Sequence, residues 1–160
     1  MVIAALMAAL VCVATMIIKI PSPLKGYMNL GDGIVLLAGW LLSPGYGFLA
    51  AGLGSALADL LLTYFSYAPA TFFIKGTMAL IAFMCFKLLN KRIGWLPSQI
   101  LGAVFAEALM IVGYYLFEGF LYGFGSSLVN IPANAVQGVA GIIIGILLIK
   151  VLEKTNISLK

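Results

Sequence analysis

The stretch SQILGAVFAEALMIVGYYLF, at residues 98–117, decides the fold class of this chain. Its one charged side chain is Glu107, near the middle of the run. About 20 apolar residues, rising ~1.5 Å each in a helix, are needed to cross the ~30 Å hydrocarbon core of a bilayer. Residues 98–117 are therefore predicted to form a transmembrane helix.

Apolar runs of similar character recur on both sides of this stretch. Turn-forming residues such as Pro21 and the tripeptide Ser43-Pro44-Gly45 separate the early runs. The run at 31–43 is short, so it is either a tilted span or a re-entrant segment, and five spans are the alternative to six. We expect an all-α integral membrane protein, one transmembrane domain over residues 1–160, with helices at about 2–20, 31–43, 45–65, 71–89, 98–117 and 131–152.

The composition excludes a water-soluble domain. Apolar residues make up 64% of the 160 residues and charged residues 9%, against about 45–50% and about 25% in soluble domains. The net charge of +4 does not indicate nucleic-acid binding, because the basic residues do not gather on a solvated face with interleaved aromatics. The expected surrounding is a lipid bilayer.

The placement of Lys and Arg predicts the orientation, because positive residues are retained on the cytoplasmic side. The first run lacks a charged leading region and a cleavage site, so we expect no signal peptide, and its abrupt start suggests that a short natural tail is missing. The expected location is the cytoplasmic membrane of a bacterial (prokaryotic) cell. With both termini cytoplasmic, Lys19 and Lys25 lie outside, and the inner side holds Lys87, Lys91, Arg92, Lys150, Lys154 and Lys160.

Several kinds of chemistry are excluded by missing residues. The chain has no His, which excludes Ser-His and Cys-His dyads and the usual zinc sites. It also lacks the P-loop pattern, so it does not hydrolyse a nucleotide in that manner. Cys12 and Cys85 each lie in an apolar stretch and are interpreted as small buried hydrophobes. We expect no catalytic residue, metal or cofactor, and any energy for transport comes from a partner.

Small residues at spacings of four indicate where helices approach closely. In the third and sixth predicted helices, such stripes are interpreted as packing within the chain. In the first helix, two overlapping pairs near the cytoplasmic end serve either this packing or contact with a partner's helix. The pairs are Ala4/Ala8 and Ala5/Ala9, and the two other stripes are Ala50, Gly54 and Ala58, and Gly141 and Gly145.

Ionisable residues at membrane depth are costly and indicate function by default. Asp59 and Lys75 lie at matching depth in consecutive helices, which predicts a structural ion pair, with ligand contact as the alternative. Glu107, Tyr114 and Glu118 share one helical face. Glu107 is expected to face the bundle interior, while Glu118 lies near the outer water and is either solvated or in contact with a ligand.

Further polar residues lie towards the same outer side. Asn130, Asn134 and Gln137 form one helical face, which either joins helices or contacts a ligand. Asp32 is interpreted as the N-cap of the second helix, and Tyr64 and Tyr67 as either interface anchors or ligand contacts. This convergence predicts a pocket for a small, planar, polar molecule. The predicted binding residues are Asn29, Tyr67, Lys75, Tyr114, Glu118, Asn134 and Gln137.

These motifs, in this order, resemble the S components of energy-coupling factor (ECF) vitamin transporters, most of all the riboflavin-transporter-like branch. The resemblance covers nearly the whole chain. It rests on the alanine pattern of the first helix and on NLGD at 29–32, SPGYGFLAAGLGSALAD at 43–59, PATFFIKG at 69–76 and NIPANAVQG at 130–138.

The resemblance implies six helices with both ends cytoplasmic and an outward-facing site lined by the first loop and helices 4 to 6. It implies that Ala4, Ala8, Ala5 and Ala9 dock on a transmembrane T component, which two ATP-binding-cassette ATPases drive, and that the subunit topples to carry its vitamin inward. The substrate identity does not carry over. Mixed amides, carboxylates and Lys75 favour pyridoxine, hydroxymethylpyrimidine or a riboflavin-like heterocycle over a strongly anionic vitamin.

Two other classes of function compete with this interpretation. An autonomous small channel or a structural homo-oligomer would place polar residues through the full membrane depth, whereas here they concentrate in the outer half. An intramembrane hydrolase would depend on Asp59 and Glu107, which share no motif.

Overall fold

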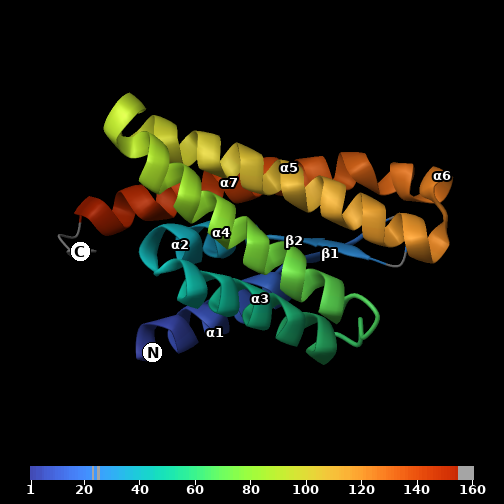
Figure 1. Cartoon of the computed structure of the whole chain (residues 1–160). Coiled ribbons are helices and arrows are strands. Elements are labelled where there is room, and N and C mark those ends of the chain that lie inside the picture. Colours follow the sequence, from blue (N-terminus) through green and yellow to red (C-terminus); the bar gives the residue numbers. More distant parts are fainter. Residues whose placement is uncertain (23, 25, 155–160) are drawn as a thin grey trace.

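The computed structural model describes residues 1–22, 24 and 26–154, so Lys25 and Lys160 lie outside the described part of the chain. The long helices run back and forth between two ends of the molecule (Figure 1). The elements are α1 Val2–Ile17, β1 Lys19–Pro21, β2 Tyr27–Asn29, α2 Asp32–Leu41, α3 Pro44–Leu61, α4 Ala68–Ile93, α5 Trp95–Tyr122, α6 Phe124–Ser127, the short 3-10 helix η1 Leu128–Asn130 and α7 Ile131–Lys154.

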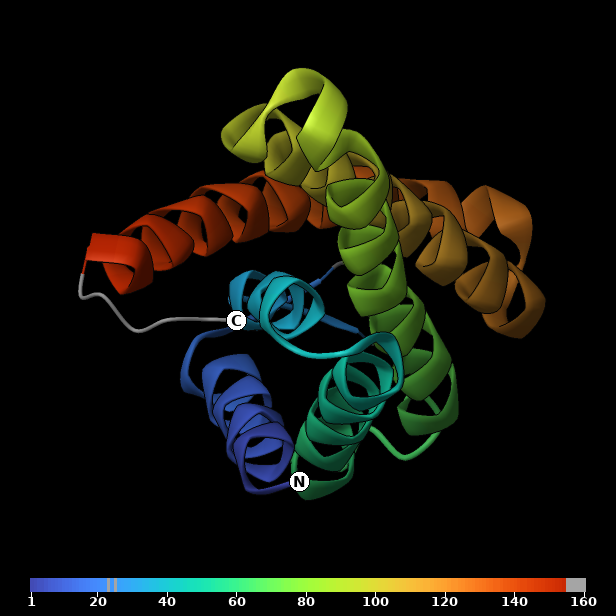
Figure 2. The same ribbon diagram turned by 60° about the vertical axis from the view of Figure 1, so that its left-hand side comes forward.

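Helix α2 is the centre of the bundle. It contacts α1, α3, α4, α5 and α7, and Figure 2 shows it enclosed by the other helices. Val35, Leu36 and Ala38 in this helix are fully buried, as expected for a helix that is apolar on all sides. Ten residues make a helix of about 15 Å, so α2 does not cross a bilayer by itself. The expectation of a short second helix is confirmed.

Three helical segments of the described chain are long and apolar enough to cross a membrane. They are Ala68–Ile93, Trp95–Tyr122 and the segment Phe124–Lys154, while α1 and α2 are shorter apolar helices. The predicted spans at 71–89, 98–117 and 131–152 therefore lie within longer helices. The predicted helix at 45–65 corresponds to α3, which ends at Leu61.

A β-hairpin replaces the end of the predicted first helix. Helix α1 ends at Ile17, and β1 pairs antiparallel with β2, Lys19 opposite Asn29 and Pro21 opposite Tyr27. Proline disfavours the helical conformation in the residue before it, and β-branched residues such as Ile18 and Ile20 favour extended backbone. The prediction of a helix through residue 20 was wrong because an apolar run does not reveal where its helix stops.

The stripes of small residues pack helices together within the chain, as predicted for α3 and α7. A Cβ added to Gly54 of α3 would lie 2.4 Å from the backbone oxygen of Ala8 in α1. A Cβ on Gly141 of α7 would lie 2.7 Å from Asp32 Cβ. These contacts leave no room for a larger side chain, so α1 lies directly on α3 and α7 directly on α2.

Candidate binding site

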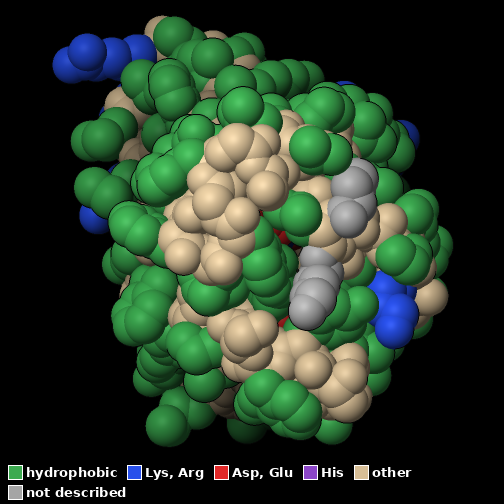
Figure 3. Space-filling model, turned by 90° about the vertical axis from the view of Figure 1, so that its right-hand side faces the viewer, with side chains coloured by type: hydrophobic (Ala, Val, Ile, Leu, Met, Phe, Trp, Pro, Cys, Tyr) green, Lys and Arg blue, Asp and Glu red, His purple; other side chains and the backbone are tan. Residues whose placement is uncertain are grey.

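A polar cavity is lined by residues of the hairpin and of α1, α3, α4, α5 and α7. Its lining residues lie towards the end of the bundle at which, in Figure 1, α3 ends and α5 meets α6. Figure 3 faces this end and shows acidic side chains at the bottom of a hollow in the surface. The cavity volume is about 30 Å³. Its lining residues are Thr15, Ser22, Gly26, Tyr27, Asn29, Ser55, Asp59, Tyr67, Thr71, Lys75, Tyr114, Glu118, Asn134 and Gln137.

All seven residues predicted to bind a ligand line this one cavity. They come from the hairpin, the start of α4, the second half of α5 and the first turns of α7, segments far apart in the sequence. The predicted set did not include Thr15, Ser22, Gly26, Tyr27, Ser55 and Thr71, and ligand contact by Asp59 was only the alternative to its ion pair. A signal existed for two of them, because Ser55 precedes Asp59, and Thr71 precedes Lys75, by one helical turn on the same face.

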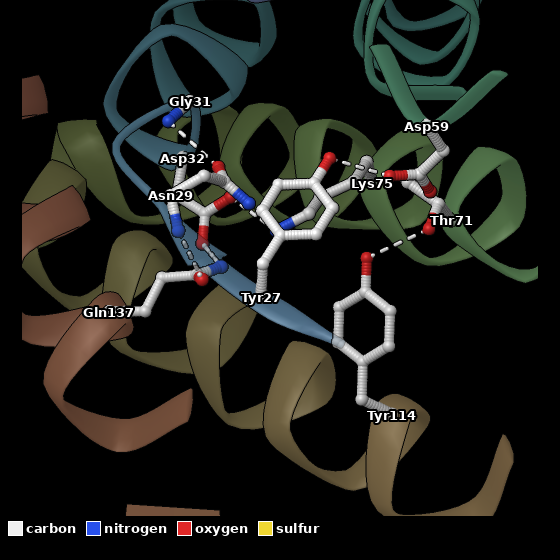
Figure 4. Close-up of polar contacts among 9 residues, drawn as sticks. All are labelled: Tyr27, Asn29, Gly31, Asp32, Asp59, Thr71, Lys75, Tyr114 and Gln137. Atoms are coloured by element: carbon white, nitrogen blue, oxygen red, sulfur yellow. Dashed lines mark hydrogen bonds and ion pairs between the residues drawn. The ribbon is translucent and has the colours of Figure 1, made fainter. Parts of the chain in front are cut away.

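At the inner side of the cavity, Lys75 forms an ion pair with Asp32. Both side chains are almost fully buried, with exposed fractions of 2% and 0%. Gln137 donates a hydrogen bond from Nε2 to Asp32 Oδ2 at 2.7 Å and accepts one from the backbone nitrogen of Asn29 at 2.9 Å. Lys75 Nζ also lies 5.5 Å from the centre of the Tyr114 ring, within reach of a cation–π interaction. These contacts tie α2, α4, α7 and the hairpin together (Figure 4).

The predicted ion pair between Asp59 and Lys75 is wrong, because Lys75 pairs with Asp32 instead. Matching depth along two helices does not determine which side of each helix the groups face, and α2 brings Asp32 to Lys75. The N-cap role predicted for Asp32 is also wrong. Gly31 is the N-cap, its backbone nitrogen donates to Asn29 Oδ1 at 2.9 Å, and the Asp32 carboxylate faces the bundle interior.

On the opposite side of the cavity, Asp59 accepts a hydrogen bond from the Tyr27 hydroxyl at 2.6 Å. Burial, and then the nearby Asp59 carboxylate, raise the pKa of the Tyr27 phenol above its usual value, so this group stays a donor. Thr71 and Tyr114 share a hydrogen bond of 3.1 Å beside the carboxylate. In Figure 4 the Tyr27 ring is drawn in front of the Lys75 side chain, and its hydroxyl is directed at Asp59.

Glu118 is buried in the outer wall of the cavity, with 3% of its surface exposed. Its Oε1 atom accepts hydrogen bonds from Asn130 Nδ2 at 2.8 Å and from the Tyr67 hydroxyl at 3.2 Å. The hairpin covers it, since a Cβ on Gly26 would lie 3.4 Å from this oxygen. Of the two interpretations of Glu118, solvation is therefore wrong. Tyr67 is also buried, so it is a cavity residue instead of an interface anchor.

Glu107 faces the bundle interior, as predicted, and lies deeper than the cavity. It is 3% exposed, and its two carboxyl oxygens have no hydrogen-bond donor among the described residues. Its Oε1 and the Cβ atom of Asp32 would each lie 2.7 Å from a Cβ at Gly141. Because Gly141 has no side chain, both acidic side chains fit between α2, α5 and α7.

The four alanines of α1 divide into two pairs. Ala4 and Ala8 are half-buried, Ala8 against α3, whereas Ala5 and Ala9 are exposed. The exposed pair belongs to an apolar face that includes Val2, Leu6 and Val13. This face is exposed, whereas the half-buried pair serves in part the packing of the chain itself.

The chain matches one family model and is similar in sequence to the two proteins described here. A family model described as the S component of an ECF-type riboflavin transporter matches residues 1–154. An uncharacterised protein of Pyrococcus woesei is 37% identical over 143 residues, covering 84% of this chain and 88% of that protein. The thiamine precursor transporter HmpT of Lactococcus lactis subsp. cremoris (strain MG1363) is 24% identical over 138 residues, covering 86% and 76%.

The fold has a solved counterpart. The S component of a bacterial ECF transporter superposes with a TM-score of 0.70 at 22% sequence identity, covering 96% of this chain and 95% of the other. At this identity the likeness concerns the fold alone.

Proposed function

The chain belongs to the S-component family of ECF-type riboflavin transporters, which are substrate-binding membrane subunits and not enzymes, and we propose that its hairpin-covered cavity captures a small polar heterocycle. The substrates proposed are pyridoxine, hydroxymethylpyrimidine or a riboflavin-like molecule. The observation that carries this proposal is the cavity itself, because polar side chains from distant segments converge there instead of facing lipid.

The cavity is proposed to face the outside of the cell. Helix α1 begins and α7 ends at the same end of the bundle, opposite the hairpin (Figure 1). Lys91, Arg92 and Lys154 lie in the last turns of α4 and α7 at that end, which the positive-inside rule assigns to the cytoplasm. This supports cytoplasmic termini, and the proposed location is the bacterial (prokaryotic) cytoplasmic membrane, which the chain crosses several times.

The same arrangement supports a partner on the face of α1. A transmembrane T component, powered by two ATP-binding-cassette ATPases, would approach the exposed Ala5/Ala9 face closely because small side chains let helix backbones come together. The cavity has about 30 Å³ of free space, too little for a heterocycle. The substrate is proposed to displace Tyr27, which lines the cavity, as it enters.

Native mass spectrometry of the purified full chain tests the proposal. We expect a small molecule bound at a ratio of one to one, and its loss when the cavity is blocked by Ser55→Trp. Ala5→Trp, on the exposed face of α1, is the matched control and should leave the bound molecule in place. A symmetric assembly of several copies without any small molecule would instead favour the channel or structural homo-oligomer.

A further inference from the structure

Three buried polar atoms in the cavity wall have no hydrogen-bond partner among the described residues. They are Ser55 Oγ, Asp59 Oδ2 and Glu118 Oε2, and their side chains are exposed by only 1%, 3% and 3%. Ser55 and Asp59 lie one turn apart on α3, and Glu118 lies on α5. Unsatisfied buried polar groups are uncommon in folded proteins and call for an explanation.

The side chains around the two carboxylates donate hydrogen bonds to them. Tyr27 donates to Asp59, and Asn130 and Tyr67 donate to Glu118. A carboxylate can accept about four hydrogen bonds, so each has unused capacity. The Thr71 hydroxyl lies beside Asp59, yet Oδ2 has no bond of hydrogen-bonding geometry. What the cavity lacks is N–H or O–H donors.

The acidic residues of the cavity wall also favour a ligand that donates hydrogen bonds and carries a positive charge. Lys75 is the one cation among the described lining residues, and Asp32 already pairs with it. Lys75 acts on Asp59 only at longer range, and neither Asp59 nor Glu118 forms an ion pair with a cation of the described wall. Buried charges are normally paired, and the Tyr27, Tyr67 and Tyr114 rings around the cavity suit a flat cation.

We propose that the cavity selects an amino-bearing heterocycle bound as a cation, with N–H donors directed at Glu118 Oε2 and Asp59 Oδ2 and a third polar contact to Ser55. The positive charge resides on an aminomethyl group or on a ring nitrogen beside an exocyclic amino group. This inference rests on the proposed function and narrows it. Of the substrates proposed above, it favours the amino-bearing hydroxymethylpyrimidine over pyridoxine and a riboflavin-like molecule, and it excludes anionic vitamins.

Isothermal titration calorimetry on the detergent-solubilised full chain tests it with two matched pairs of probes. One pair is pyridoxamine and pyridoxine, and the other is 4-amino-5-hydroxymethyl-2-methylpyrimidine and its 4-oxo analogue. Within the pair whose ring fits, we expect the amino member to bind at least about tenfold tighter, as for a hydrogen bond to a charged group. E118Q and D59N should each reduce this preference, and E153Q, which removes an exposed carboxylate of α7, should not.

Several results would overturn the inference. Equal affinity within the pair that binds would do so, as would an unchanged preference in both E118Q and D59N when circular dichroism shows them folded. If no probe binds, the molecule that co-purifies with the chain decides, because a cation with N–H donors supports the inference and an anion or a neutral molecule contradicts it. If no small molecule binds at all, the proposed function fails as well.

Discussion

The two groups of buried acids differ in how completely they are satisfied. The inner group, Asp32 with Lys75 and Gln137, uses both carboxylate oxygens in contacts within the chain. The cavity group, Asp59 and Glu118, leaves one oxygen of each carboxylate without a partner. Both groups are almost fully buried, so burial does not distinguish them. The inner group joins elements of the fold, whereas the cavity group has bonding capacity left for a ligand.

The largest expected effect comes from breaking the inner group with Lys75→Met. Met keeps most of the side-chain volume but leaves Asp32 buried without its cation, which costs about 3–5 kcal/mol of stability. Thermal unfolding in detergent should show a large drop in Tm. Lys87→Met, which removes an exposed cation from the same helix, is the control and should have little effect.

A second variant separates pairing from ligand contact at the same position. Asp32→Asn combined with Lys75→Met removes both charges and should recover part of the lost stability. If Lys75→Met instead left Tm unchanged and abolished ligand binding, Lys75 would belong to the cavity group and the comparison between the two groups would fail.

The difference between the groups also shows what could be predicted from the sequence. Helix positions follow from runs of apolar residues, and half of the fourteen cavity residues follow from the position of polar groups along the chain, because membrane depth can be counted at ~1.5 Å per residue. The ECF family resemblance, based on motif order, is confirmed by the family match. Depth is only one coordinate, however. The partner of Lys75 depends on the direction in which each helix faces and on α2, whose apolar character is compatible with burial but does not show which helices surround it.

The hairpin could not be predicted for a different reason. Each strand has three residues, too few for an alternating pattern to show. The apolar residues of β1 continue the run of the first helix, so only Pro21 signals a break. The hairpin covers Glu118 and brings Tyr27 to Asp59. Because the hairpin was not predicted, the burial of Glu118 was not predicted either.

A smaller effect is expected from Asn134→Ala, which changes the cavity wall alone. Asn134 lines the cavity three residues before Gln137 but belongs to neither acid group. Loss of one polar contact to a bound ligand should weaken binding by about 1 kcal/mol, or roughly fivefold in Kd. Titration calorimetry measures this, with Tm expected to stay unchanged. An unaltered Kd would indicate that the amide face of α7 serves packing and not the ligand.

A still smaller effect is expected from Glu107→Gln, next to the inner group. Gln has nearly the same shape and is neutral, and its side-chain amide can donate a hydrogen bond to the neighbouring Asp32. We expect the free energy of unfolding to change by less than ~1 kcal/mol, or to rise. A loss as large as that of Lys75→Met would show that Glu107 is a full member of the inner group.

The least effect on either acid group is expected from Ala9→Leu, which lies on the exposed face of α1. Tm and ligand Kd should both match those of the unmodified chain, because neither the inner group nor the cavity contacts this face. ATP-driven uptake by the assembled transporter should nevertheless be lost, since a bulky side chain keeps the partner's helices apart.

The variant Ala8→Leu tests the half-buried pair of alanines in the same way. Ala8 packs on α3 at Gly54, and α3 contributes Ser55 and Asp59 to the cavity, so this variant should lower Tm and weaken ligand binding in addition to uptake. If Ala9→Leu transported normally while Ala8→Leu alone failed, the alanines of α1 would serve the bundle, and the docking face would have to lie elsewhere on the chain.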